Sequence, residues 1–203
     1  MSKVLTLSDV KKKPSILTYN FILSSGEKTV LRPLESKDLN DLAIFLKNLS
    51  PQTRKFYTFP TFGLRIAKEL CDAINKYDKL RFIVKSKSSK KIIALFEFSF
   101  DIPEGDKKRF LKHNIKLNSQ NYCRFAPCIA DNYQNKKIGS LVFPYMVNIA
   151  HKFGRKKIIL WGGVLAKNGR AIRFYKNNGF KKLGKFRDIN RNNEYSVDMI
   201  RLK

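Results

Sequence analysis

Four separate runs of the first hundred residues are rich in the apolar, β-branched and aromatic residues that favour strands. Two of these runs lie on either side of Ser25-Gly26-Glu27 and predict a hairpin that begins at Tyr19. The other two begin at Leu80 and Lys91 and are separated by the polar residues 87–90, which predicts a second, antiparallel hairpin.

Between the two hairpins the apolar residues recur at helical spacing instead. They predict helices over about 37–49 and 64–77. Pro51 follows a serine that can cap a helix, so we expect a short helix to begin there.

The rest of the chain alternates strand and helix patterns. In order, it predicts a strand in YCRFAPCIAD, a helix over 139–153, a strand in KIILWGGV, a helix over 168–177, and closing strands near 180–187 and 195–202. This order is typical of a mixed α/β domain, with a central sheet of about seven strands flanked by about four helices.

Two segments show no such period. Residues 1–15 contain three successive lysines and are expected to form a loose arm or an edge decoration. Residues 101–120 are polar and long for a loop, and we interpret them as an insertion that could fold over a site. The chain of 203 residues fits one domain, predicted over 16–203 after the arm at 1–15.

The composition narrows the class of protein. Hydrophobic residues make up 43% of the chain, enough for a core, and this excludes wholesale disorder. No apolar run is long enough to span a bilayer, and the N-terminus lacks a signal-peptide pattern, so we expect a soluble, cytoplasmic protein without a membrane partner. It is expected to be a monomer or homodimer.

The cysteines and histidines do not suggest a metal site or a disulfide framework. Cys71, Cys123 and Cys128 form no CxxC pair, so buried free thiols are expected. His113 and His151 lie in no recognisable metal spacing and are interpreted as surface or boundary residues.

The net charge is +26, from 42 basic and 16 acidic residues, which raises the question of a polyanionic partner. Lysine outnumbers arginine and is spread along the chain, which is more typical of a solvated basic surface than of base recognition. We therefore predict only weak and non-specific binding to nucleic acid. An acidic small molecule or the phosphates of a cofactor are the other partners that this charge could serve.

One segment carries a chemical signal of its own. A buried strand ending near Ala130 leads through a short polar loop to Gly139, at the start of the predicted helix. Backbone N–H groups and the positive end of the helix dipole meet there, which favours an anion such as a phosphate. Lys136 and Lys137 add charge, although many such junctions bind nothing.

Two motifs give this segment a context. The loop Gln134-x-x-Lys137-x-Gly139 is similar to the pyrophosphate loop of the GNAT acetyltransferase superfamily, Q/R-x-x-G-x-G/A. The run Asn168-x-x-Ala171-x-x-Phe174-Tyr175-x-x-x-Gly179-Phe180 is similar to the second signature of that superfamily. The chain resembles the superfamily over residues 19–202, and the resemblance implies a GNAT fold with a sheet splayed at the cofactor strand.

The resemblance also implies acetyl-CoA as a co-substrate, with no metal. The strand end at Cys128, Ile129 and Ala130 would pair with the pantetheine arm. The pyrophosphate would be held by Gln134, Asn135, Lys136, Lys137, Ile138, Gly139 and Ser140. Asn168 would contact the arm, and Ala171 and Phe174 belong to the same cofactor-binding signature.

Tyr175 would face the thioester sulfur and protonate the departing thiolate. Residue chemistry agrees, because a phenol with a pKa near 10 can protonate a thiolate of comparable basicity. The alternative is an ordinary packed tyrosine.

The sequence departs from the family pattern at three positions. Lys137 replaces the first loop glycine, which costs about 1 kcal/mol if that residue needs a positive φ. Pro144 interrupts the following helix, so a kink or a late helix start is expected. Arg124 stands where several protein-acetylating members place a basic carboxylate.

Glu97 is the candidate to replace that base, because a carboxylate in the apolar strand ALFEFSF is suited to take a proton from an ammonium. The alternative is that Glu97 pairs with Arg124 or another cation on a neighbouring strand. Arg124 and Arg81 could instead bind a carboxylate or phosphate on the acceptor.

Together these features predict an N-acetyltransferase in which a small-molecule amine attacks acetyl-CoA directly in a ternary complex. A protein lysine or N-terminus is the alternative acceptor. A non-catalytic CoA-binding protein associated with nucleic acid is the alternative from another class.

Overall fold

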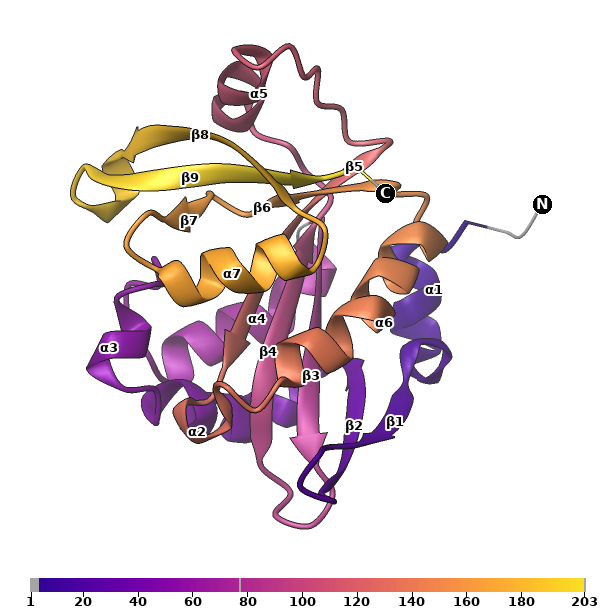
Figure 1. Ribbon diagram of the computed structural model, residues 1–203. Coiled ribbons are helices and arrows are strands. Elements are labelled where there is room, and N and C mark those ends of the chain that lie inside the picture. Colours follow the sequence, from indigo (N-terminus) through magenta and orange to yellow (C-terminus); the bar gives the residue numbers. More distant parts are fainter. Residues whose placement is uncertain (1–3, 77, 203) are drawn as a thin grey trace. The chain divides into compact units, whose positions relative to one another are not determined.

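The computed structural model describes residues 4–76 and 78–202, which form two compact units (Figure 1). The first unit comprises Leu5–Glu97 and Pro127–Val142. The second comprises Phe98–Ala126 and Phe143–Lys203, with Met1–Val4. Three elements contribute residues to both units: β4 (Ile92–Ser99), β5 (Tyr122–Ile129) and α6 (Ile138–Lys152).

The first unit holds the N-terminal helices and the two hairpins. Its elements are α1 (Leu7–Lys12), η1 (Pro14–Leu17), β1 (Tyr19–Ile22), β2 (Lys28–Pro33), η2 (Ser36–Asp38), α2 (Leu39–Lys47), α3 (Pro51–Arg54), α4 (Leu64–Lys76), β3 (Lys79–Ser86), most of β4 (Ile92–Ser99), the end of β5 (Tyr122–Ile129), η3 (Asp131–Tyr133) and the start of α6 (Ile138–Lys152).

The second unit holds the rest of β4, β5 and α6. Its own elements are α5 (Glu104–Leu111), β6 (Lys157–Leu160), β7 (Val164–Leu165), α7 (Gly169–Asn177), β8 (Lys181–Asp188), η4 (Ile189–Arg191) and β9 (Glu194–Arg201).

The strands run in the order β1-β2-β3-β4 in the first unit, with β1, β2 and β3 antiparallel. In the second unit the order is β5-β6-β9-β7, and β8 pairs with β9. β5 and β6 are parallel and pair only over Tyr122–Phe125. The mixed α/β class is confirmed, and the described residues hold nine strands and seven α-helices.

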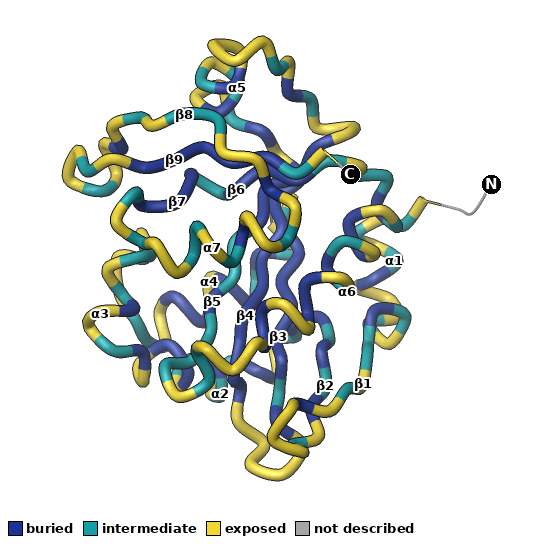
Figure 2. Tube along the Cα trace, viewed as in Figure 1, coloured by how far each residue is buried: buried dark blue, intermediate teal, exposed yellow. Residues whose placement is uncertain are grey.

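The amphipathic helices form because their apolar faces share a core. In the first unit α2 and α4 lie side by side, and Leu42, Phe45 and Leu46 of α2 are buried with Leu70 of α4. Figure 2 shows that β3, β4 and β9 are mostly buried, whereas the loop tips are exposed. The predicted hairpins and the helix over 37–49 are confirmed within a few residues, and the short helix begins at Pro51 as expected. The helix predicted over 64–77 is confirmed over Leu64–Lys76, and residue 77 lies outside the described residues.

One expectation about strands was wrong. KIILWGGV is not one strand, because Gly162 and Gly163 adopt φ values of +69° and +68° and separate β6 from β7. Of the two alternatives for Pro144, the late helix start is excluded because α6 begins at Ile138, and the kink stays a prediction.

The two segments without hydrophobic period both contain a helix. Thr6 caps α1 through a reciprocal capping box with Asp9, and Val10 is fully buried, so residues 7–12 are a packed decoration instead of a loose arm. In the insertion at 101–120, α5 buries Phe110 against Tyr122 and Ile159 of its own unit.

Candidate cofactor-binding site

The loop before α6 has the backbone of an anion site. Asn135 and Lys137 adopt φ values of +61° and +59°, while Lys136 between them does not. Alternating conformations of this kind turn successive N–H groups toward one side. The first helical hydrogen bond joins Leu141 N to Lys137 O at 2.9 Å, so the N–H groups of Ile138, Gly139 and Ser140 have no intrahelical partner.

The loop also carries positive charge that the start of α6 does not offset. Asn135, Lys136 and Lys137 are exposed, and the first turn of α6 contains no acidic residue. The ammonium of Lys136 lies 5.4 Å from the centre of the Tyr133 ring. Because Lys137 occupies the left-handed region where the family has glycine, the loop keeps its backbone at a cost of about 1 kcal/mol.

The end of β5 leaves one edge without a strand partner. N–H and C=O groups of alternate residues point to the same edge of a strand. Ala130 N donates to Ile93 O of β4 at 2.9 Å, so the carbonyls of Pro127 and Ile129 point to the opposite edge. Side chains occupy both of these carbonyls: Tyr57 Oη donates to Pro127 O and Gln134 Nε2 to Ile129 O, each at 2.9 Å.

These hydrogen bonds determine which groups of the predicted site residues remain to bind a cofactor. The Gln134 side chain also donates to Thr53 Oγ1 at 3.0 Å, so it is engaged within the protein and the loop offers backbone groups instead. Pro127 has no N–H, and the N–H of Ile129 is the donor that the open edge of β5 presents.

Asp131 ties α3 to the end of β5. Its carboxylate accepts hydrogen bonds from Ser50 N (2.8 Å), Ser50 Oγ (2.6 Å) and Thr53 Oγ1 (2.6 Å). Burial raises the pKa of Asp131, but the hydrogen bonds from Ser50 and Thr53 outweigh it, and the net shift is downward. Sequence reasoning missed this contact; Ser50 was visible only as a helix cap.

In the second unit, Asn168 caps α7 and Tyr175 lies on the same helix. Asn168 Oδ1 accepts from Ala171 N at 3.1 Å, which leaves its amide NH₂ for other partners. The Tyr175 ring is buried between Phe174 and Phe180, with centroid distances of 5.1 and 5.2 Å. Burial raises the pKa of Tyr175, partly offset by the charge of Arg191. The phenol therefore stays protonated at neutral pH, but it is a weaker acid than the free phenol on which the sequence-based argument rested.

Glu97 forms an ion pair with Arg81 on the adjacent strand β3, and both side chains are buried. The sequence allowed Glu97 to pair either with Arg124 or with another cation on a neighbouring strand. In the described structure its partner is Arg81. The Nη1 atom of Arg81 is buried without a hydrogen-bond partner among the described residues. The charge of Glu97 contributes to the raised pKa of the buried Cys128 thiol, after the larger effect of burial.

Arg124 is engaged within the second unit. Its Nε donates to Asp101 O and its Nη2 to Ser99 Oγ, both at 2.9 Å, and its guanidinium lies 4.7 Å from the Trp161 ring. Burial is the main cause that lowers the pKa of this guanidinium. These contacts tie β5 to the beginning of the insertion.

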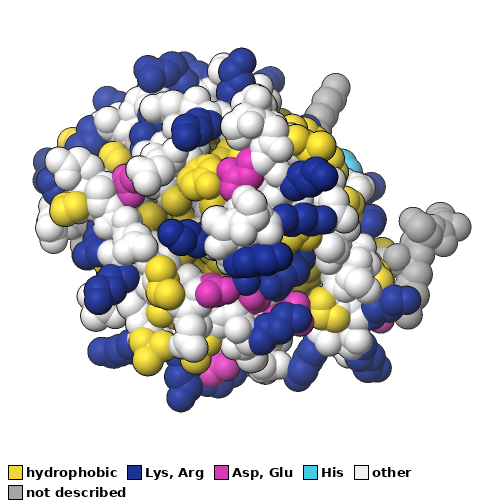
Figure 3. Space-filling view, turned by 90° about the horizontal axis from the view of Figure 1, so that it is seen from below, with side chains coloured by type: hydrophobic (Ala, Val, Ile, Leu, Met, Phe, Trp, Pro, Cys, Tyr) yellow, Lys and Arg dark blue, Asp and Glu magenta, His cyan; other side chains and the backbone are white. Residues whose placement is uncertain are grey.

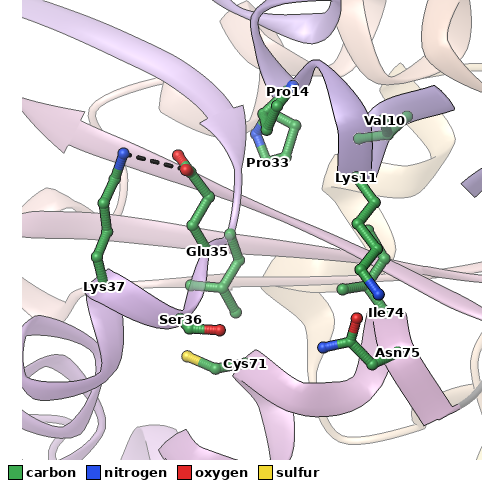
Figure 4. A pocket seen from close by; sticks show the side chains of 11 residues that line it. Val10, Lys11, Pro14, Pro33, Glu35, Ser36, Lys37, Cys71, Ile74 and Asn75 are labelled. Carbon is green, nitrogen blue, oxygen red and sulfur yellow. Dashed lines mark ion pairs between the residues drawn. The ribbon is translucent and has the colours of Figure 1, made fainter. Parts of the chain in front are cut away.

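A hollow of about 320 Å³ lies elsewhere in the first unit (Figure 4). Residues of α1, η1, the β2–η2 turn and α4 line it, and Lys37 and Glu35 form an ion pair of 3.0 Å at its rim. It contains none of the predicted site residues. Burial raises the pKa of Cys71, its one thiol, to about 11.

Two features are absent from the part of the chain that the structure describes. No cluster of three or more His, Cys, Asp or Glu side chains suited to a metal ion is present in residues 4–76 and 78–202. No helix within the same residues is long and apolar enough to cross a membrane.

Solved acetyltransferases share this architecture. The GNAT domain of PAT from S. lividans has a TM-score of 0.69 at 15% identity, covering 92% of this chain and 97% of that one. For the ribosomal-protein-S5-alanine acetyltransferase from Vibrio fischeri the TM-score is 0.68 at 15% identity, covering 91% and 96%. For the aminoglycoside acetyltransferase AAC(6')-Ib, solved with coenzyme A, it is 0.66 at 17% identity, covering 86% and 95%.

The sequence itself matches no protein-family model, and no curated protein matches it. The likeness therefore lies in the fold. The chain has the GNAT fold, as the two sequence motifs predicted.

Proposed function

We propose that this protein is an N-acetyltransferase that moves the acetyl group of acetyl-CoA to a primary amine of a small molecule. The observation that carries the proposal is the loop 134–140, which has left-handed residues at Asn135 and Lys137 and unpaired N–H groups at the start of α6, on a GNAT fold. Such a loop suits the pyrophosphate of CoA.

In this proposal, one group of residues binds the pyrophosphate of acetyl-CoA and another binds its pantetheine arm. Backbone N–H groups of residues 138–140 bind the pyrophosphate, and the exposed ammonium groups of Lys136 and Lys137 complement its charge. The Ile129 N–H, on the open edge of β5, binds a carbonyl of the pantetheine arm. The free amide of Asn168 contributes a second polar contact to the arm.

Two residues move protons in the proposed reaction. The neutral amine attacks the thioester carbonyl, the C–S bond breaks, and Tyr175 gives its proton to the departing thiolate. Glu97 takes the proton that the amine loses. Because Arg81 engages Oε1 of Glu97, the second carboxylate oxygen receives this proton.

The first test is binding. Acetyl-CoA at a hundredfold excess over Kd should stabilise the fold by about 2.7 kcal/mol, measured as a rise in Tm. The matched control is Lys137→Glu, which reverses a loop charge and should reduce the shift. Absence of any shift at millimolar acetyl-CoA contradicts the proposal.

The second test is turnover. Thiol release from acetyl-CoA is followed against a panel of small amines, amino sugars and peptides. Acetylation of small amines supports the proposal. Selective acetylation of peptides points to a protein acceptor, and CoA binding without any turnover points to a non-catalytic role.

A further inference from the structure

The carboxylates around the candidate site are already in use. Glu97 is paired with Arg81, and both oxygens of Asp131 accept from Ser50 or Thr53. Glu27, beside the loop, accepts from Tyr133 Oη at 3.2 Å on each oxygen. If the acceptor were a diamine, its second ammonium group would therefore have no unpaired carboxylate to bind among these residues.

The same holds across much of the described chain. Acidic side chains in ion pairs with Lys or Arg are Glu35, Asp38, Asp41, Asp72, Glu97, Asp101, Glu104, Asp106, Asp188, Glu194 and Asp198. The net charge of +26 is carried by the cations that remain. Figure 3 shows Lys and Arg side chains spread over the face seen from below, with acidic side chains among them, several near its middle. The potential over such a surface attracts anions and repels polycations.

The buried guanidinium of Arg81 supplies a local donor. Its Nε is bound to Glu97, while its Nη1 has no partner among the described residues. A buried donor without a partner is unfavourable, so an anionic group that reaches Nη1 gains a hydrogen bond there.

From these observations we infer that the acceptor is a small amine whose body carries an anionic group, a carboxylate or a phosphate, and not a polyamine. This inference rests on the proposed acetyl transfer and names its substrate class. The cationic surface draws the acceptor in, and Arg81 holds its anionic group while the amine attacks.

The test compares three amines with the same four-carbon chain: 4-aminobutyrate, butylamine and 1,4-diaminobutane. With the reacting amine neutral, they carry charges of about −1, 0 and +1. The expected order of kcat/KM is 4-aminobutyrate, butylamine, 1,4-diaminobutane. Added salt should lower kcat/KM for the first and raise it for the last, because the Debye length shortens from about 30 Å at 0.01 M to about 8 Å at 0.15 M.

Three variants locate the effect. Lys55→Glu reverses an exposed charge next to α3, which Asp131 ties to the end of β5, and should lower the preference for 4-aminobutyrate about threefold. Lys12→Glu on α1 makes the same change at another exposed position and should leave the preference unchanged. Arg81→Lys keeps the charge but loses Nη1, and it should also lower the preference for 4-aminobutyrate. Because this preference is a ratio of two kcat/KM values for the same enzyme, partial unfolding does not alter it.

Each outcome is decisive. If butylamine or 1,4-diaminobutane is the better substrate, or salt raises kcat/KM for 4-aminobutyrate, the inference about substrate class is wrong while acetyl transfer stands. If none of the three is acetylated although acetyl-CoA still raises Tm, the proposed transfer to small amines fails, and this inference fails with it.

Discussion

In the proposed reaction Tyr175 supplies the proton that lets CoA leave. The variant Tyr175→Phe keeps the ring between Phe174 and Phe180 but removes the hydroxyl. We expect kcat to fall about 100-fold or more while the Kd of CoA stays near the wild-type value. Stopped-flow turnover and calorimetric titration with CoA measure the two quantities.

Phe180→Leu is the control for packing around this ring, because it disturbs the same aromatic cluster and keeps the phenol. It should lower Tm more than Tyr175→Phe does, and kcat less. Undiminished turnover of Tyr175→Phe, under conditions where chemistry limits the rate, would contradict the role of the phenol.

At the scale of elements, α3 depends on a carboxylate that is distant in the sequence. Asp131→Asn removes the charge that Ser50 and Thr53 bind, and we expect the free energy of unfolding to fall by about 1–2 kcal/mol. Chemical denaturation at pH 7 measures this difference. Asp41→Asn, which breaks a more exposed pair with Lys85, should cost less than about 1 kcal/mol.

The pH dependence of that difference follows from the lowered pKa of Asp131. A depressed pKa in the folded state stabilises the protein above the unfolded value, about 3.9 for Asp. The difference between wild type and Asp131→Asn should stay constant from neutral pH down to about pH 5. It should then shrink as the pH falls through the folded pKa. A gap that widens in acid would show that the carboxylate is not stabilised by these hydrogen bonds.

The break between β6 and β7 offers a matched pair of glycines. Gly162 and Gly163 have similar positive φ values, so alanine strains the backbone at either position by about 1 kcal/mol. A Cβ on Gly163 would also lie 2.9 Å from both Phe186 Cε1 and Val197 O, whereas nothing lies within 4 Å at Gly162. Gly163→Ala should therefore lower Tm by several degrees more than Gly162→Ala, and equal shifts would contradict the close approach.

The elements that could be predicted from the sequence are those with a complete hydrophobic period. α2, α4 and the two hairpins have one, and the structure places them within a few residues of the prediction. α5 was missed because Phe110 is its one buried apolar residue, while its other buried residue, Asp106, is ion-paired with Arg109, which also binds Asp198. A single buried apolar residue produces no period.

In the candidate site, too, local motifs could be predicted from the sequence, and contacts between distant residues could not. The loop motif and the Asn168 motif are local in the sequence, so they could be recognised, and the positive φ at Lys137 could be stated as a condition. The contacts of Asp131 with Ser50 and Thr53 span about eighty residues, and the choice of Arg81 over Arg124 as the partner of Glu97 depends on strand order. No local pattern encodes either one.

At the scale of the whole molecule, positive charge is less evenly distributed than lysine content suggests. No Asp or Glu lies between Asp131 and Asp188, and this stretch includes the exposed lysines of β8. If the predicted weak binding to nucleic acid uses this stretch, replacing Lys181, Lys182 and Lys185 by Glu should weaken binding to a DNA duplex at least tenfold at low salt.

The same triple change at Lys11, Lys12 and Lys13 is the control, since these exposed lysines follow Asp9 by two to four residues in the sequence. It should weaken binding less. The slope of log K against log salt should become shallower in the β8 variant, by about 0.9 for each phosphate that the protein no longer neutralises. Equal effects of the two triple changes would indicate that the charge acts without a preferred surface.

The three cysteines are free and buried, and this has a practical consequence for measuring catalysis. Burial raises the pKa of Cys71 to about 11 and of Cys128 to about 12, and it raises that of Cys123 as well. Thiols that are shielded and protonated react slowly with disulfide reagents. A chromogenic thiol reagent will therefore report CoA released by the folded enzyme almost without background, and a burst of protein thiol in the same assay will give the fraction of molecules that have unfolded.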